Sequence, residues 1–272
     1  MAGGKWAAPA IITALPESES RDSRPLIVVH RGYCAEAVEN SLGAVRAALA
    51  LPVDGIEIDV HLTADRVPVL MHDKKVDRTT DGTGAIRDLT LSQLRSLRMR
   101  RNESDPTPSQ EPVPTLDEVL AETSGERLLA IEVKPEGMER EVLDVIRRHR
   151  AGAWVWIWSF RRSVIKTFHE LAPEIAGAFL SVGFDDWPAE RCFEQALSLG
   201  SIGVSLYPET VSPEVVELGH RMGLEIYSGT PNDPAEWERL RLAGIDAIIT
   251  DDAPELLKFW AGRSPPAGRL RP

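Results

Sequence analysis

The stretch of sequence that decides the fold reads Gly55-Ile56-Glu57-Ile58-Asp59-Val60-His61-Leu62-Thr63-Ala64-Asp65-Arg66-Val67-Pro68-Val69-Leu70-Met71-His72-Asp73. In its first half apolar residues alternate with acids, which is the pattern of a β-strand with two different faces. Glu57 and Asp59 are two residues apart, so both carboxylates project from the same face of that strand. The polar residues 63–66 and the β-rich run from Val67 to Met71 predict a hairpin that brings His72 back near the level of Glu57.

This stretch has two interpretations. Two carboxylates and an imidazole that meet at one point suit a divalent cation engaged in phosphoryl chemistry. The alternative is an edge hairpin with a solvated acidic face, which is the more common setting for two acids on a strand. The rest of the chain is needed to decide between them.

The composition excludes several classes of protein. The chain has 272 residues, of which 43% are hydrophobic and 27% charged, so a large core is expected and disorder is not. A formal net charge of −11 argues against nucleic acid as a partner, because a basic footprint is missing. The cysteines Cys34 and Cys192 imply no disulfide framework. Neither a membrane-spanning run nor a signal-peptide pattern is present, so we expect a cytoplasmic enzyme without membrane insertion.

The chain divides into one domain and two tails. Residues 1–24 are poor in apolar periodicity, and we expect a flexible tail that can be removed up to Ser23 without loss of stability. A single domain is expected from residue 25 to 262, with an insertion at about 61–113, followed by a C-terminal tail at 263–272. The sequence leaves open whether the chain forms a homo-oligomer.

Eight apolar runs typical of buried strands follow one another, most of them separated by helical segments. They are Leu26–Val29, a run that ends at Asp59, Leu128–Val133, Trp154–Trp158, Ile175–Leu180, Ile202–Leu206, Leu224–Tyr227 and Ala247–Asp251. Thr115 and Glu118 form a capping-box pattern at the start of one of the helices. Eight strands alternating with helices predict a (β/α)₈ TIM barrel with a hairpin-bearing insertion after the second strand. A doubly wound open sheet is the alternative fold.

Ionisable residues gather at the predicted C-terminal strand ends, where barrel enzymes place their working residues. These ends carry His30, Arg31, Glu57, Asp59, Glu132, Lys134, Ser159 and Asp251. Glu132 would add a third carboxylate to Glu57 and Asp59, and three such groups would repel one another strongly without a cation. Because the expected ligands are oxygens, the sequence favours Mg²⁺, Ca²⁺ or Mn²⁺ over zinc.

Two histidines frame these acids. His30 and His72 are candidates for a general acid and a general base, since an unperturbed imidazole has a pKa of about 6.5. A lone histidine after a strand is more often a capping or core residue, but two that flank three acids are harder to explain in that way. Arg31 and Lys134 can neutralise phosphate oxygens. The remaining histidines, which lack such a setting, are interpreted as surface or packing residues: His61, His149, His169 and His220.

Taken as an ordered set, the motifs resemble those of one known family. They are His30-Arg31-Gly32, Glu39-Asn40-Ser41, Glu57-Ile58-Asp59-Val60, His72-Asp73, Arg78-Thr79-Thr80 with Gly84, Pro114-Thr115-Leu116, Glu132-Val133-Lys134 and Gly244-Ile245-Asp246-Ala247-Ile248-Ile249-Thr250-Asp251. From about Ile27 to Leu257 the chain resembles the glycerophosphodiester phosphodiesterases. The resemblance implies a (β/α)₈ fold and cleavage of glycerophosphodiesters to sn-glycerol 3-phosphate and an alcohol. It also implies that Glu57, Asp59 and Glu132 hold the metal and that His30 and His72 do the acid–base work.

The sequence departs from this family at two places. Val38 stands where the family usually has proline before the glutamate, which we interpret as a change of turn. The family often has a Trp-Thr-x-Asn segment at the end of the seventh strand, where this chain reads Ile226-Tyr227-Ser228-Gly229-Thr230-Pro231-Asn232-Asp233. The second difference affects the expected contacts with the alcohol part of the substrate.

Two other functions compete with a soluble glycerophosphodiesterase. One resembles the sphingomyelinase D and lysophospholipase D branch, which releases a cyclic phosphate. A lipid-facing enzyme of this kind would need an exposed apolar rim, and no loop of the sequence offers a clear one. The other is a catalytically inactive barrel that binds phosphodiesters, and it ranks last because all five expected metal and acid–base residues are present.

Overall fold

Eight parallel strands close into a barrel in the computed structural model, which describes residues 24–105, 108–181 and 188–261. The strands are β1 (Leu26–Val29), β2 (Gly55–Leu62), β4 (Leu128–Val133), β5 (Val155–Ser159), β6 (Ala176–Leu180), β7 (Gly203–Leu206), β8 (Glu225–Gly229) and β9 (Ala247–Thr250). Each strand pairs with the next, and β1 closes the barrel by pairing with both β9 and β2. The predicted TIM barrel is therefore confirmed, and the open sheet is wrong.

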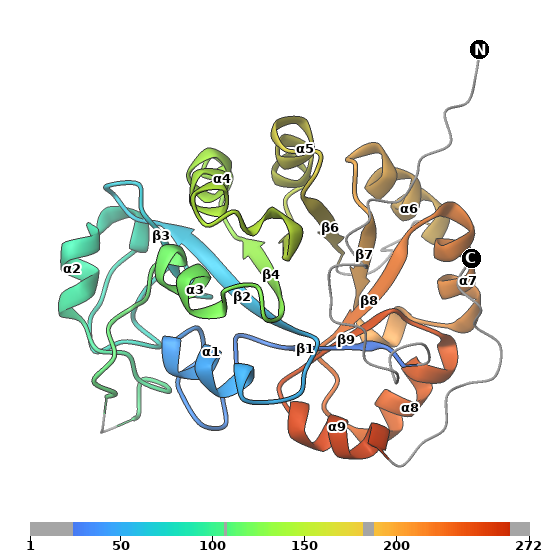
Figure 1. Ribbon diagram of the computed structural model, residues 1–272, viewed down its shortest axis with the longest axis horizontal. Helices are drawn as coiled ribbons and strands as arrows, with labels where there is room; N and C mark the ends of the chain where they lie inside the picture. The colour runs from blue at the N-terminus through green and yellow to red at the C-terminus, as the bar shows by residue number, and fades with distance from the viewer. Residues whose placement is uncertain (1–23, 106–107, 182–187, 262–272) are drawn as a thin grey trace.

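Helices surround the barrel and follow its strands (Figure 1). They are α1 (Leu42–Leu49), α3 (Leu116–Thr123), α4 (Glu139–Arg148), α5 (Arg162–Leu171), α6 (Ala189–Ser198), α7 (Pro213–Met222), α8 (Pro234–Ala243) and α9 (Ala253–Ala261). Short 3₁₀ turns lie at Ile86–Asp88, Ala151–Ala153 and Pro208–Thr210. The capping box predicted from Thr115 and Glu118 is present at the start of α3, where it satisfies backbone N–H groups that have no partner within the helix.

The predicted hairpin is formed by β2 and the short strand β3 (Pro68–Leu70), which pairs antiparallel with Val60 opposite Leu70. The insertion that begins here also contains helix α2 (Leu91–Ser96) and lies to one side of the barrel (Figure 1). A separate cluster of buried apolar side chains holds the insertion together and joins it to Val38 in the loop between β1 and α1. Its members are Val38, Val69, Met71, Val76, Ile86, Leu94, Met99 and Val113. This small core is separate from the barrel interior. It includes Met71, so it stabilises the loop that carries His72.

Strand alternation separates two layers of apolar packing. On β2, Ile56, Ile58 and Val60 belong to the large cluster between strands and helices, so the opposite face of the strand points into the barrel. The barrel interior is filled by a second cluster, in which Tyr227 stacks on Trp156 and Trp158 at ring-centroid distances of 5.5 and 5.7 Å. The inward residues Glu57 and Asp59 lie beyond this apolar filling, at the C-terminal end of the barrel. This arrangement places both acids in a buried site.

The domain begins close to where the sequence predicted. Arg24, which we assigned to the tail, forms an ion pair with Asp54 at 2.6 Å, and Asp54 also accepts a hydrogen bond from the backbone N–H of Ile27. The rest of the expected N-terminal tail and the expected C-terminal tail lie outside the described residues. Among the residues that the structure describes, we find no helix with the length and apolar character needed to cross a membrane.

Candidate metal and acid–base site

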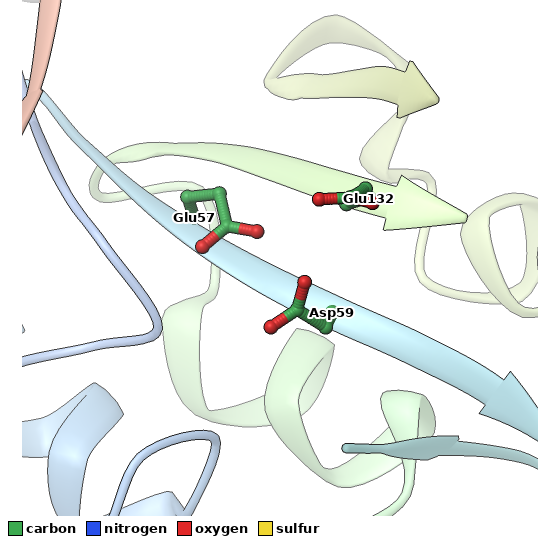
Figure 2. Close-up of side chains that lie close together, drawn as sticks. All are labelled: Glu57, Asp59 and Glu132. Atoms are coloured by element: carbon green, nitrogen blue, oxygen red, sulfur yellow. The ribbon is translucent and has the colours of Figure 1, made fainter. Parts of the chain in front are cut away.

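Three carboxylates meet at the C-terminal end of the barrel. Glu57 and Asp59 come from β2, and Glu132 lies on the neighbouring strand β4, directly opposite Asp59 in the strand register (Figure 2). One oxygen from each residue lies within 4.8 Å of the others. The three residues are 2%, 1% and 8% exposed, so the alternative of a solvated acidic face is wrong. Carboxylates this close and this buried require positive charge nearby.

The loop between β1 and α1 fixes two of these carboxylates. Asn40 donates a hydrogen bond from its side chain to Asp59 at 2.8 Å and accepts one from the Asp59 backbone N–H at 2.9 Å. The backbone N–H of Arg31 donates to Glu57 at 2.9 Å. Arg31 has a φ of 56° and Gly32 a φ of 74°, and a Cβ at Gly32 would lie 2.7 Å from the backbone of Ala44. The glycine of the His30-Arg31-Gly32 motif is therefore required by the shape of this loop.

Lys134 and Arg31 supply the local positive charge. The Lys134 ammonium lies 2.7 Å from Asp59 Oδ1 and 2.7 Å from Glu132 Oε1. Arg31 Nε lies 3.3 Å from Asp59 Oδ2. Asp59 Oδ1 is buried, and the Lys134 ammonium is its charged partner. Three converging carboxylates form an all-oxygen donor set that fits a hard divalent cation.

The crowding of charge shifts the pKa values of these acids. Burial, followed by repulsion from Asp59, raises the pKa of Glu57 to about 8. Burial also raises the pKa of Glu132, against the attraction of Lys134. Burial acts in the same direction on Asp59, but Lys134 and Arg31 outweigh it and hold the pKa of Asp59 below its ordinary value. In the protein without a cation, Glu57 is therefore largely protonated near neutral pH.

His30 lies at the end of β1 and is paired with Asp251, the residue that follows β9. The distance from His30 Nδ1 to Asp251 Oδ1 is 2.8 Å. Asp251 is held by the neutral side chain of Asn232, whose amide donates to it at 2.8 Å. Burial lowers the pKa of His30, but the hydrogen bond that His30 donates to Asp251 and the attraction of the Glu57 carboxylate outweigh burial and raise it. Asn232 belongs to the segment in which the chain departs from the family pattern, and it orients Asp251.

His72 lies just after β3 and is paired with Asp73 in a similar way. The distance from His72 Nδ1 to Asp73 Oδ1 is 2.8 Å. Here the carboxylate is held by a cation, since Arg78 Nε donates to Asp73 at 2.8 Å. Burial is the largest influence on His72 and lowers its pKa, although Asp59 and Asp73 act against it. Both histidines are thus bonded to an aspartate, but Asp251 is held by a neutral amide and Asp73 by a cation.

The structure brings together the residues that the sequence proposed and adds others. The predicted carboxylates lie in one cluster with Lys134 and Arg31, and each predicted histidine has an aspartate partner. From the sequence we expected no role for Asp73, Arg78, Glu39 or Asn232. Asp73 adjoins His72, and Asp73, Arg78 and Glu39 belong to motifs of the resembled family. Of the other histidines, His61 is buried with Nε2 3.2 Å from the backbone oxygen of His72, which agrees with a packing role.

Residues 30–255 match the model of the glycerophosphoryl diester phosphodiesterase family. A protein of Caldanaerobacter subterraneus subsp. tengcongensis named glycerophosphodiester phosphodiesterase is 32% identical over 245 residues, which cover 87% of this chain and 98% of that protein. In a solved structure, an Oleispira antarctica phosphodiesterase in complex with the product sn-glycerol-3-phosphate is 27% identical with a TM-score of 0.75, covering 88% of this chain and 97% of that one. The structure of a putative glycerophosphoryl diester phosphodiesterase from Silicibacter pomeroyi is similar in fold, with a TM-score of 0.81 at 23% identity, covering 88% and 94% of the two chains.

Proposed function

The chain belongs to the glycerophosphoryl diester phosphodiesterase family, and we propose that it hydrolyses a small glycerophosphodiester of the cytoplasm to sn-glycerol 3-phosphate and an alcohol with one divalent cation. The observation that carries this proposal is the buried cluster of Glu57, Asp59 and Glu132 at the C-terminal end of a barrel that also presents two histidine–aspartate pairs. The relative from Oleispira antarctica was solved with sn-glycerol-3-phosphate as its product, which supports the same product here.

Glu57, Asp59 and Glu132 would hold the cation, for which the all-oxygen donor set favours Mg²⁺, Ca²⁺ or Mn²⁺. When bound, such an ion withdraws charge from phosphate oxygens and lowers the pKa of a coordinated hydroxyl group. Arg31 and Lys134 lie beside the carboxylates and would balance the charge that builds up on the phosphoryl oxygens.

The two histidines would move the protons. The pKa values of Asp251 and Asp73 lie below their ordinary value. Burial is the largest influence on Asp251 and opposes this shift, but the hydrogen bond from His30 and its attraction outweigh burial, whereas for Asp73 the hydrogen bond from Arg78 is the largest influence. Both carboxylates are therefore ionised and can only accept hydrogen bonds. Each histidine therefore keeps a proton on Nδ1 and presents Nε2 for catalysis. One of His30 and His72 would take the proton of the glycerol 2-hydroxyl while the other protonates the oxygen of the departing alcohol.

The glycerol 2-hydroxyl would act as the nucleophile. Its oxygen would attack phosphorus, the bond from phosphorus to the alcohol oxygen would break, and a cyclic 1,2-phosphate would form, in which phosphorus bridges the glycerol 2-oxygen and the neighbouring oxygen that already carried it (O3 in sn-numbering). In a second step water would open the ring, with the two histidines exchanging roles, and leave sn-glycerol 3-phosphate. Because the attacking hydroxyl and the phosphorus belong to the same molecule, the reaction avoids the entropic cost of bringing two reactants together.

A lysophospholipase D-like activity is the second candidate, and one observation favours it. Two of the exposed large apolar side chains, Phe160 and Tyr207, follow directly on β5 and β7 and are 44% and 41% exposed. The sequence had led us to expect no clear apolar rim, but these loops lie at the end of the barrel that carries the carboxylates. Two aromatic side chains in such loops could contact the acyl chain of a lysolipid.

A substrate panel tests the proposal and separates the two candidates. The protein is assayed with glycerophospho-choline, -ethanolamine, -inositol and -glycerol and with a lysolipid, each with Mg²⁺, Ca²⁺ or Mn²⁺. We expect turnover of at least one soluble diester to sn-glycerol 3-phosphate and loss of it in Glu132→Gln. Turnover of the lysolipid alone, reduced in Phe160→Ala, would favour the second candidate. No turnover of any diester with any of the three ions would contradict the proposed function.

A further inference from the structure

Arg78 connects two parts of the chain that the site needs. It lies in the insertion, five residues after Asp73, and its guanidinium donates to Asp73 from Nε at 2.8 Å and from NH2 at 3.2 Å. The same group donates to Glu39, in the loop between β1 and α1, from NH1 at 2.9 Å and from NH2 at 2.7 Å. Two carboxylates from separate segments thus share one planar group of donors. Only arginine can make such a doubly bidentate contact.

On the insertion side, this contact determines how Asp73 meets His72. Asp73 Oδ1 receives both His72 Nδ1, at 2.8 Å, and Arg78 NH2, at 3.2 Å. The second oxygen of Asp73 is held by Arg78 Nε. Asp73 is about one-third exposed, so without Arg78 its side chain could turn toward water and release the imidazole.

On the barrel side, Glu39 and Arg31 connect Arg78 to the carboxylate cluster. Glu39 lies 3.2 Å from Arg31 NH1, and Arg31 Nε lies 3.3 Å from Asp59. Asp59 does not depend on this route, because Asn40 holds it through two hydrogen bonds of its own. Loss of Arg78 should therefore disturb His72 far more than the metal ligands.

The loop around Arg78 is folded by other contacts. The backbone N–H of Val76 donates to the carbonyl of Gly84, and the Gly84 N–H donates to the Asp77 side chain. Val76 is also part of the separate apolar core of the insertion. A substitution at Arg78 should consequently leave the insertion folded.

We propose that Arg78 is a positioning residue. It holds Asp73 in the orientation that bonds to His72, and through Glu39 it holds the insertion against the β1–α1 loop, so that His72 stays in place for catalysis. This inference rests on the proposed function. In the described part of the chain, the side chain that donates to the aspartate partner of His30 is the neutral Asn232, where Asp73 has the cationic Arg78. We therefore expect the position of His72 to depend on the cation Arg78 and that of His30 on the amide of Asn232.

Kinetics of Arg78→Gln and Arg78→Lys test the proposal. Because a small misplacement of a general acid or base costs one to two orders of magnitude, we expect kcat to fall about 10- to 100-fold in Arg78→Gln, with KM and cation Kd changed less than about threefold. Arg78→Lys should recover only part of the loss. In a His72→Ala background, Arg78→Gln should cost less than about twofold more, because the group through which it acts is gone.

Arg95→Gln is the matched control. Arg95 in α2 forms another ion pair between the insertion and the barrel, with Glu118 in α3, and its side chain is as exposed as that of Arg78. We expect this variant to keep wild-type kcat. An equal loss in Arg95→Gln would show that loosening of the insertion is the cause and would overturn the proposal. Unchanged kcat in Arg78→Gln, undiminished loss in the His72→Ala background, or a larger effect on cation Kd than on kcat would overturn it as well.

A spectroscopic measurement separates failure of this inference from failure of the proposed function. In the ¹⁵N spectrum of the histidine side chains, His72 of the wild type should appear as the neutral form with the proton on Nδ1. Arg78→Gln should produce a mixture of the two neutral forms, and Arg95→Gln should not. This measurement needs no substrate, so an unchanged His72 spectrum in Arg78→Gln refutes the positioning role whatever the enzyme hydrolyses.

Discussion

Binding of a divalent cation should release a proton from Glu57. Burial and the charge of Asp59 raise the pKa of Glu57 to about 8, whereas its ordinary value is 4.5. A carboxyl group with that pKa is about 90% protonated at pH 7, and a metal ligand must be ionised, so Glu57 alone should release about 0.9 proton when the cation binds at pH 7. At pH 9 the same group is about 90% ionised already, and the release should fall to about 0.1 proton.

Calorimetry measures this number directly. Mg²⁺ is titrated into chelator-treated protein at pH 7 in two buffers with different ionisation enthalpies, such as PIPES and Tris. The difference between the observed heats, divided by the difference between the buffer enthalpies, gives the protons released. The titration at pH 9 is the control with the same protein and ion. Heats at pH 7 that do not depend on the buffer would refute the reasoning, because Glu57 would then be ionised before the ion arrives or would not be a ligand.

The same pKa has a consequence for stability, and its sign can be worked out. A carboxyl group whose pKa is raised in the folded state stabilises the fold most at pH values below its unfolded pKa of 4.5 and loses that contribution as pH rises through about 8. The cation-free protein should therefore lose stability from this group between pH 5 and pH 9. Saturating Mg²⁺ should oppose the loss, which melting temperatures across this range would show.

Three further predictions concern single groups. His30→Ala and His72→Ala should each lower kcat at least about 100-fold with little change in cation affinity, and an effect below about tenfold in either would remove that histidine from the acid–base chemistry. Gly32→Ala should lower the free energy of unfolding by more than about 1 kcal/mol in urea titrations, because φ is positive there and the new Cβ would meet Ala44, and an unchanged midpoint would contradict this account of the loop. A diester that lacks the glycerol 2-hydroxyl should bind as a competitive inhibitor but barely turn over, whereas normal turnover would indicate direct attack by water.

The strand pattern was enough to predict the fold and the clustering of the three carboxylates. Alternation in residues 55–60 placed Glu57 and Asp59 on one face, and the buried run that ends in Glu132-Val133 placed a third acid on another strand of the barrel. Strand pairing has a period of two residues and parallel strands present their C-terminal ends together, so these positions follow from local sequence. The strand β4 (Leu128–Val133) was predicted with its observed bounds.

The contacts of long charged side chains could not be predicted in the same way. Lys134 was expected to meet phosphate, and its ammonium lies between Asp59 and Glu132. From the sequence, Arg78 could be identified only as part of a motif. Its partners Glu39 and Asp73 lie in two loops that are far apart in the sequence and meet only in the folded protein. Rotamers of such side chains depend on the tertiary structure, which no spacing rule describes.

The most direct test of the proposed hydrolysis is a ³¹P NMR time course with glycerophosphocholine, or whichever diester of the panel is turned over. Protein stripped of cations by a chelator should leave the diester signal unchanged, and addition of Mg²⁺, Ca²⁺ or Mn²⁺ should convert it into the signal of sn-glycerol 3-phosphate. Glu132→Gln should fail to do so under the same conditions. Full conversion by stripped protein, or a final product other than sn-glycerol 3-phosphate, would contradict the account.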